Sequence, residues 1–247
     1  MNKESLKAIV VGATSGIGKE LVNILTKEGW EVGIAGRREE ELQKMQSKNL
    51  NIVATESIDI THSDAGNKLI KLISKTGGMD LYFHSSGIGY QNRTLDIDKE
   101  LITIETNALG MVRMVDTAFH YFIRHPEKDG IISVISSIAG TKGLGPAPSY
   151  SSSKRFVSHY LESLTHLCHI RKIKHIKFID IRPGFVNTPL INYGTKYPMQ
   201  MSALYVANKI HKAIKNGKSI VTINWKYRVL VFLWRLIPRC LWVRIKL

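Results

Sequence analysis

The stretch KAIVVGATSGIG, residues 7–18, decides the fold. An apolar, β-branched run ends at Val11, as in a strand buried on both faces of a parallel sheet. Glycines then let the chain turn tightly, and the helical pattern that follows would offer free N–H groups and a positive dipole to a phosphate. A glycine trio alone is weak evidence, but its place between strand and helix predicts a dinucleotide-binding turn. That turn comprises Gly12, Thr14, Ser15, Gly16, Ile17 and Gly18.

Strand-like and helix-like patterns alternate along the rest of the chain. Strands are expected at Lys7–Val11, Glu31–Ala35, Ile52–Ser57, Met79–His84, Ile131–Ile135, Ile176–Ile181 and Ile220–Ile223. Helical patterns lie near 16–28, 39–47, 63–76, 98–124, 150–170 and 202–216. This alternation predicts an α/β fold: a Rossmann-like, doubly wound parallel sheet of about seven strands with helices on both faces. With no linker or repeat, residues 1–224 form one expected domain.

Composition bounds the class of protein. The 247 residues are 44% hydrophobic, which suits one large α/β domain. The two cysteines, Cys168 and Cys240, match no metal or redox spacing, and the histidines come with no carboxylates at a ligand spacing, so no metal is expected. The polar opening leaves no room for a secretory signal before Gly12, which favours a cytoplasmic location.

The net charge of +15 is concentrated late in the chain. Twelve Lys and Arg and no acid follow Asp180. Residues 225–247 form a basic segment in which Arg228, Arg235, Arg239 and Lys246 fall within about 40° at helical spacing, although Pro238 should interrupt the helix. Tryptophans and leucines fill most of the remaining circumference, which favours a peripheral contact with the inner face of a membrane over nucleic acid. The alternative is a tail packed on its own domain or on a partner subunit.

The end of the second strand bears on the choice of cofactor. An acid about 20 residues after the glycines would bind the ribose hydroxyl of NAD, but this chain has Arg37 and Arg38 there. A guanidinium forms charge-assisted hydrogen bonds with a 2′-phosphate, so the sequence favours NADP(H) over NAD(H), with Arg37 as the first contact and Arg38 as a second. The alternative is two solvated arginines at the start of a helix.

A tyrosine and a lysine four residues apart provide the candidate acid–base chemistry. Tyr150 and Lys154 should share one face of a helix, where the ammonium would lower the pKa of the phenol. Ser137 lies just beyond the expected strand Ile131–Ile135, where catalytic groups of open α/β sheets collect. A Tyr–Lys pair by itself is more often structural, and it indicates catalysis only together with Ser137 and the glycine turn.

Together these residues resemble the classical short-chain dehydrogenase/reductase family over roughly residues 5–222. The resemblance implies hydride transfer between NAD(P)(H) and a carbonyl or alcohol, with Tyr150 as acid/base, Ser137 holding the substrate oxygen, Lys154 binding the nicotinamide ribose and Asn107 anchoring a water. It also assigns cofactor contacts to Asp59, Ser86, Gly87, Pro183, Gly184 and Thr188. The chain departs from the family at His84-Ser85-Ser86-Gly87, where two asparagines are usual, and His84 is interpreted as structural.

The expected function is an NADPH-dependent carbonyl reductase or alcohol dehydrogenase, acting on a lipid or lipid-linked ketone if the tail binds membrane. The segment Pro189–Ser202, with Tyr193, Tyr197, Met199 and Met201, is expected to supply an apolar pocket wall. Two alternatives stay open: a non-catalytic NADP(H)-binding regulator, and a dehydratase or epimerase of the same fold. The resemblance further implies a homodimer or homotetramer built through the helices of Asn107 and Tyr150.

Overall fold

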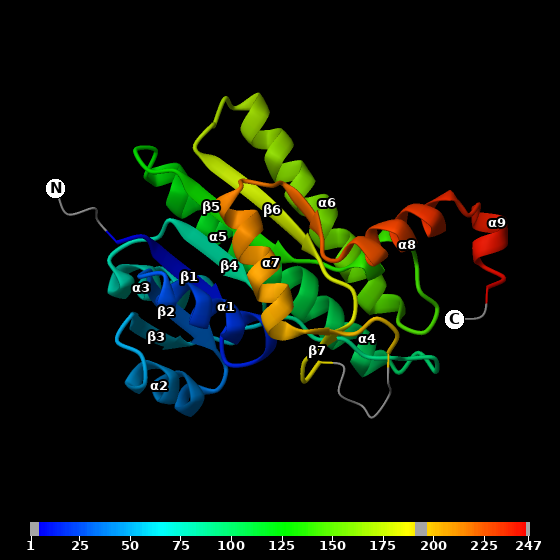
Figure 1. Cartoon of the computed structure of the whole chain (residues 1–247), viewed down its shortest axis with the longest axis horizontal. Helices are drawn as coiled ribbons and strands as arrows, with labels where there is room; N and C mark the ends of the chain where they lie inside the picture. The colour runs from blue at the N-terminus through cyan, green and yellow to red at the C-terminus, as the bar shows by residue number, and fades with distance from the viewer. Residues whose placement is uncertain (1–4, 191–196, 246–247) are drawn as a thin grey trace.

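The computed structural model describes residues 5–190 and 197–245, and its centre is a seven-stranded parallel sheet (Figure 1). The strand order is β3-β2-β1-β4-β5-β6-β9, so the chain starts in the middle and winds out to both edges. The strands are β1 (Lys7–Val11), β2 (Glu31–Gly36), β3 (Ile52–Ser57), β4 (Leu81–His84), β5 (Gly130–Ile135), β6 (Ile176–Arg182) and β9 (Ile220–Thr222). The predicted doubly wound sheet of about seven strands is therefore confirmed.

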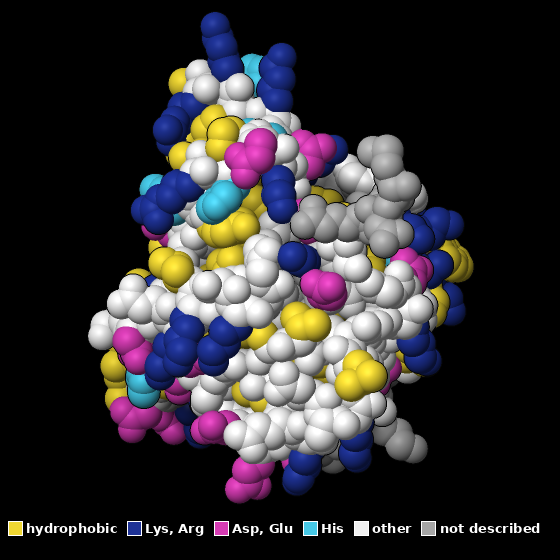
Figure 2. All heavy atoms as spheres, turned by 90° about the vertical axis from the view of Figure 1, so that its left-hand side faces the viewer, with side chains coloured by type: hydrophobic (Ala, Val, Ile, Leu, Met, Phe, Trp, Pro, Cys, Tyr) yellow, Lys and Arg dark blue, Asp and Glu magenta, His cyan; other side chains and the backbone are white. Residues whose placement is uncertain are grey.

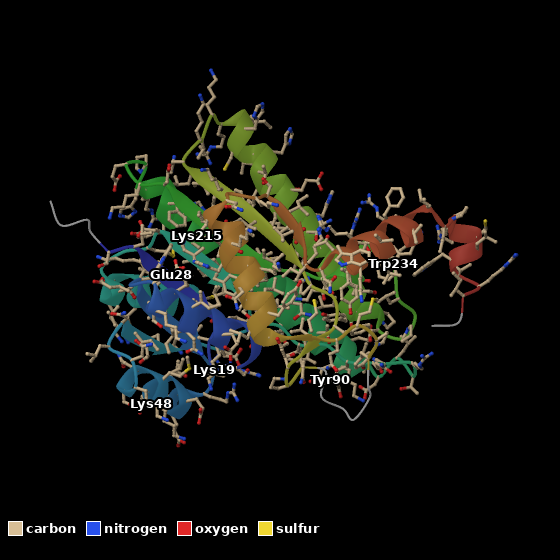
Figure 3. The ribbon with its side chains drawn as sticks, in the orientation of Figure 1. Lys19, Glu28, Lys48, Tyr90, Lys215 and Trp234 are labelled. Carbon is tan, nitrogen blue, oxygen red and sulfur yellow. The ribbon has the colours of Figure 1, made fainter. Side chains whose placement is uncertain are left out.

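Helices cover both faces of the sheet. One face packs against α3 (Ala65–Thr76), α5 (Met111–Arg124) and α6 (Pro148–Ile170). The other packs against α1 (Gly16–Lys27), α2 (Glu39–Ser47) and α7 (Ala203–Lys215). Successive β1 residues alternate between the two cores, with Ile9 on one side and Val10 on the other, as a strand buried on both faces requires. On the second face the carboxylate of Glu28, the residue directly after α1, forms a salt bridge with Lys215 at the end of α7 (Figure 3).

The helix predicted over 98–124 is interrupted in the structure. It consists of α4 (Ile97–Ile104), a π-helical turn (Glu105–Gly110) and α5. Apolar residues recur through all three segments, so the sequence pattern does not mark the interruption. Asp96 caps α4 by accepting hydrogen bonds from the backbone N–H of Asp98 and Lys99. The acids Asp96, Asp98 and Glu100 thus form a helix start.

Two local features differ from what the sequence pattern suggests. Thr61 and Asp64 have the spacing of a helix-starting box, but the Thr61 hydroxyl donates to Asp59 and the Asp64 carboxylate pairs with Lys68. The loop after β6 also contains a short parallel pair, β7 (Val186–Asn187) with β8 (Met201–Ser202), which the sequence did not predict. Strands of two residues are too short to show the alternation of apolar and polar residues by which a strand is predicted.

The C-terminal segment forms α8 (Trp225–Leu236) and α9 (Arg239–Trp242), and the chain turns at Pro238 between them as predicted. Asn224 begins α8 with a left-handed backbone and accepts the N–H of Lys226. One side of α8 packs into the core through Tyr227 and Val231. None of the described helices is long and apolar enough to cross a membrane.

Candidate active site

The glycine turn brings the carboxyl ends of three strands together. The N–H groups of Gly12 and Ala13 both donate to Ala35 at the end of β2. Gly12 has a φ of +84°, and a β-carbon there would lie 2.7 Å from the backbone nitrogen of Ser86, beyond β4. A β-carbon at Gly18 would lie 2.2 Å from the Gly12 carbonyl oxygen. Side chains are therefore excluded from both positions by backbone approach.

The start of α1 suits an anion. Ser15 precedes the helix in an extended conformation, its side chain makes no capping hydrogen bond, and no acid occupies the first turn. The N–H groups at this end thus keep their positive potential. Gly16 lies against Thr188, whose Cγ2 would be 3.0 Å from an added β-carbon. Thr188 therefore lies beside the glycine turn.

The two arginines after β2 point to different partners. Arg38 donates to the Thr14 hydroxyl from Nε at 3.1 Å and from Nη2 at 2.6 Å. Arg37 instead lies near enough to Asp59 for its charge to act on that carboxyl. Burial raises the pKa of Asp59, but hydrogen bonds from Thr61 and the charge of Arg37 hold it below its ordinary value. The guanidinium at the glycine turn is thus that of Arg38, which was placed second in the sequence prediction.

Ser137 and Tyr150 approach each other from β5 and α6. Ser137 begins the 3₁₀ turn Ile138–Thr141, its Oγ accepting the N–H of Ala139 at 3.1 Å. Burial raises the pKa of Tyr150, while a hydrogen bond with the Ser137 side chain acts in the opposite direction. The backbone of Gly89 lies against the tyrosine ring, because an added β-carbon would be 2.6 Å from Cδ2. The tyrosine side chain therefore contacts two other segments, the turn at Ser137 and the loop at Gly89.

Lys154 lies one turn along α6 with its ammonium in the interior. Its Nζ donates to the Ile135 carbonyl at 3.0 Å and lies 5.8 Å from the centroid of the Tyr150 ring. Burial lowers the pKa of Lys154 to about 8, and the charge of Asp180 opposes this shift. The sequence predicted that the ammonium would lower the pKa of Tyr150. In the structure the pKa of Tyr150 is raised instead, because loss of solvent outweighs the other effects.

Asn107 lies in the π-helical turn and pairs with the loop after β4. Its side-chain oxygen accepts the N–H of Ile88 at 2.9 Å, and its Nδ2 donates to the Ile88 carbonyl at 2.7 Å and to Ser153 Oγ at 3.1 Å. A β-carbon at Gly87 would lie 3.1 Å from Asn107 Oδ1 and 3.3 Å from Lys154 Nζ. Gly87 thus allows the strand end to approach both polar side chains. Such π-helical turns often occur at functional sites.

His84 lies in the interior at the end of β4. It is buried, and its Nδ1 lies 2.8 Å from the Tyr82 hydroxyl. Burial, together with the charge of Lys154, lowers the pKa of His84 to about 3, so the imidazole is neutral. Within the described ranges, 5–190 and 197–245, no group of three or more His, Cys, Asp or Glu side chains could hold a metal ion. Both Cys168 and Cys240 are free thiols.

Pro183 and Gly184 follow β6 and lie beside the turn that begins at Ser137. The Pro183 carbonyl accepts the N–H of Ile138 at 3.1 Å and faces the Ser137 hydroxyl at 3.4 Å. A β-carbon at Gly184 would lie 2.2 Å from Cζ of Tyr227 on α8. Of the predicted pocket wall, Tyr197 stacks on Phe185 with centroids 4.4 Å apart, and Tyr193 is outside the described residues.

Sequence reasoning missed three contributors to this region. Ser153 bonds Asn107, Asp180 is buried in a pair with Arg182 at 2.6 Å beside Ser136, and Tyr227 supports the Gly184 backbone. Asp180 carried a signal, since an acid inside the apolar run of β6 needs a partner when buried. Tyr227 carried none, because its partner lies far away in the sequence.

Comparison with known protein families identifies the family from the sequence. The family model described as short chain dehydrogenase matches residues 6–197, which include every predicted catalytic and cofactor-binding residue. The chain belongs to the short-chain dehydrogenase family. An uncharacterized oxidoreductase of Myxococcus xanthus (strain DK1622) is 28% identical to this short-chain dehydrogenase over 239 residues, covering 94% of the chain and 92% of the relative.

Solved structures share the fold of this short-chain dehydrogenase. A Burkholderia cenocepacia short-chain dehydrogenase in complex with NADP superposes with a TM-score of 0.81 at 19% identity, covering 99% of this chain and 98% of that one. A Burkholderia phymatum short-chain dehydrogenase/reductase in complex with NAD gives 0.79 at 17% identity, covering 94% of both chains. At these identities the likeness concerns the fold.

Proposed function

We propose that this short-chain dehydrogenase is an NADPH-dependent carbonyl reductase, able also to run as an alcohol dehydrogenase. The observation that carries the proposal is the convergence of Ser137, Tyr150 and Lys154 at the carboxyl edge of the sheet. The hydroxyl and phenol are hydrogen-bonded, and the buried ammonium lies 5.8 Å from the ring. A set of one proton donor, one hydroxyl and one cation suits the reduction of a carbonyl group.

The cofactor assignment is supported by the glycine turn. Gly12, Gly16 and Gly18 leave the uncapped start of α1 open to a pyrophosphate, and Ser86 and Gly87 extend that surface. Asp59 would face the adenine side, while Pro183, Gly184 and Thr188 would flank the nicotinamide side. Ser15 and Ile17 contribute their backbone to the turn. When bound, the reduced nicotinamide supplies the hydride.

The chain's own residues supply the proton. Tyr150 would donate its phenolic proton to the substrate oxygen as the carbonyl carbon becomes an alcohol, and Ser137 would donate a hydrogen bond to the same oxygen. The raised pKa of Tyr150 means that the phenol is protonated at neutral pH, which favours the reducing direction. Lys154 would stabilise the phenolate left behind and bind the ribose. Asn107 would position the loop at Ile88 and a water that returns the proton.

The preference for NADPH rests on Arg38. Its guanidinium lies at the Thr14 hydroxyl, within the turn, while the charge of Arg37 lowers the pKa of Asp59. A 2′-phosphate beside Thr14 and Arg38 would receive charge-assisted hydrogen bonds from the guanidinium. Glu41, in the first turn of α2, forms a salt bridge with Lys44 at 3.0 Å. It would therefore repel a bound 2′-phosphate less than an unpaired carboxylate would.

An Arg38→Ala variant tests this preference by fluorescence titration with NADPH and with NADH. Loss of a hydrogen bond to a charged group costs about 2 kcal/mol, or about thirtyfold in the dissociation constant. We expect this loss for NADPH and less than a twofold change for NADH. Lys48→Ala, at the opposite end of α2, is the matched control (Figure 3). Equal losses for both cofactors, or tighter binding of NADH by the unaltered protein, would overturn the assignment.

The substrate proposed is an apolar carbonyl compound, such as a lipid or lipid-linked ketone. Gln91 donates to the Tyr197 hydroxyl at 3.1 Å, which links the loop beside Tyr150 to the aromatic pair Phe185–Tyr197. A stoichiometric loss of NADPH with a ketone separates this proposal from a regulator and from a dehydratase or epimerase. The homodimer or homotetramer remains a prediction, and the exposed Phe156 on α6 belongs to the face available for it.

A further inference from the structure

The outer side of α8 exposes a continuous apolar arc. Tyr227 and Val231 face the core, whereas five large apolar side chains on the opposite side are exposed. At about 100° per residue these five fall within an arc of roughly 100°. They are Trp225, Val229, Phe232, Leu233 and Leu236, each between 47% and 64% exposed. A contiguous apolar surface of this kind often marks an interaction site, whereas single scattered apolar residues are normal on protein surfaces.

Basic residues border the arc on both sides. At the same helical spacing Lys226 lies along one edge, and Arg228 and Arg235 lie along the other. Since no acid follows Asp180 in the sequence, none lies in this segment. The side of the molecule away from α8 and α9 instead mixes acidic and basic side chains (Figure 2). On α8, by contrast, the apolar arc is bordered by cations and by no acid.

The segment after Pro238 continues the surface and is fixed to the domain. Leu241, Val243 and Ile245 are exposed beside Arg239 and Arg244. On the inner side, Trp242 Nε1 donates to the Gly143 carbonyl and Lys142 Nζ donates to the Ile237 carbonyl, both at 2.8 Å. Together α8 and α9 project from the end of the molecule away from the start of β1 (Figure 1).

We propose that residues 225–245, as α8 and α9, form a docking surface for an anionic lipid membrane. The occupant follows from charge complementarity, because cations at the edges would meet phosphate headgroups while Phe232 and Leu233 enter the acyl boundary. A second copy of the chain docked on this surface would place its own cations opposite these, and the like charges would repel each other. A nucleic acid would contact the cations but leave the apolar arc in water.

Docking here would place the membrane beside the proposed substrate side. Trp234, on α8, donates from Nε1 to the Thr141 hydroxyl at 2.8 Å, four residues after Ser137 (Figure 3). The Tyr227 hydroxyl accepts the N–H of Phe185 and donates to the Met199 carbonyl, both at 3.1 Å. The same helix therefore holds the two segments that would line the substrate entrance. Membrane binding does not depend on the proposed reductase activity; delivery of an apolar carbonyl to the site does.

The test is co-sedimentation of the full chain with vesicles of phosphatidylcholine, alone or with 30% phosphatidylglycerol. Removing the segment would also remove Tyr227 from the core, so point variants are used. We expect at least tenfold stronger binding to the anionic vesicles. Phe232→Glu with Leu233→Glu should weaken it at least tenfold, because two exposed anchors lose their apolar burial. Leu50→Glu, a highly exposed leucine outside the segment, should leave it unchanged.

A charge series completes the experiment. Arg228→Gln and Arg235→Gln should each weaken binding to anionic vesicles by about fivefold, with no effect on neutral ones. All variants should keep their melting temperature and their affinity for NADPH, which shows that they fold. Three results would overturn the proposal: a full chain that stays in the supernatant with both vesicles, equal weakening by Leu50→Glu, or a change of oligomeric mass in the Phe232/Leu233 variant. Binding to a DNA duplex with no binding to vesicles would assign the surface to nucleic acid instead.

Discussion

Replacing Lys154 by Met should show that the ammonium costs the protein stability, and that this cost depends on pH. The side chain is buried, and its pKa falls from 10.5 to about 8 on folding. That difference corresponds to about 3 kcal/mol of unfolding free energy lost while the amine is charged. Methionine occupies a similar volume and carries no charge. The carbonyl of Ile135 loses one donor, which costs about 1 kcal/mol at any pH.

The sign follows from proton binding. Below pH 8 both the folded and the unfolded protein hold the proton on Lys154, so the native protein bears the full cost. Between pH 8 and 10.5 the unfolded state holds more protons, and the stability of the native protein rises with pH. The variant should therefore be about 2 kcal/mol more stable than the native protein at pH 7. This advantage should fall by about 2 kcal/mol by pH 9.5.

Urea denaturation of the cofactor-free protein, followed by circular dichroism, measures this difference. Other titrating groups are common to both proteins, so their contributions cancel. Lys48→Met, an exposed lysine on the same chain, serves as control, and its effect on stability should not vary with pH. If the difference between the Lys154 variant and the native protein were the same at pH 7 and 9.5, the ammonium would not be buried as described. The variant should have lost its reductase activity at every pH.

Two further predictions concern packing around the site. Gly18→Ala would place a β-carbon 2.2 Å from the Gly12 carbonyl oxygen, so the turn must shift and NADPH binding should weaken at least tenfold in a fluorescence titration. Gly143→Ala is the control, because the space around Gly143 is open and NADPH affinity should change little. Equal losses of affinity in the two variants would contradict this prediction. Tyr227→Phe leaves the Phe185 N–H without its acceptor and should lower the unfolding free energy in urea by about 1–3 kcal/mol, with KM raised more than kcat is lowered. An unchanged midpoint would show that the hydroxyl does not support that loop.

Much of the fold was readable because its signals are local. The apolar runs that became β1 to β6 lie between glycines and amphipathic stretches, and each was predicted within two residues. The π-helical turn around Asn107 was not readable, because apolar residues recur through α4, the turn and α5 and do not mark the one residue that is added. The register that places Asn107 on Ile88 is set by packing across the sheet.

The sequence named the candidate site residues but could not show how their side chains are oriented. Arg37 and Arg38 are adjacent and chemically identical, and only the non-helical backbone of Arg38 before α2 turns its guanidinium to Thr14. The raised pKa of Tyr150 was also unpredictable, since it depends on how completely Gly89 and its surroundings exclude water. Tyr227 was part of a segment interpreted by its charge, whereas its contribution is a hydrogen bond beneath Gly184.

The most direct test of the central claim is single-turnover reduction of an apolar ketone, such as 2-decanone, by NADPH bound to the native protein and to Tyr150→Phe. The variant keeps the ring against Gly89 but has no proton to donate. We predict unchanged NADPH affinity and a rate of NADPH oxidation lower by a factor of about 10²–10⁴. A variant that oxidises NADPH within tenfold of the native rate would contradict the assignment of Tyr150 as the proton donor.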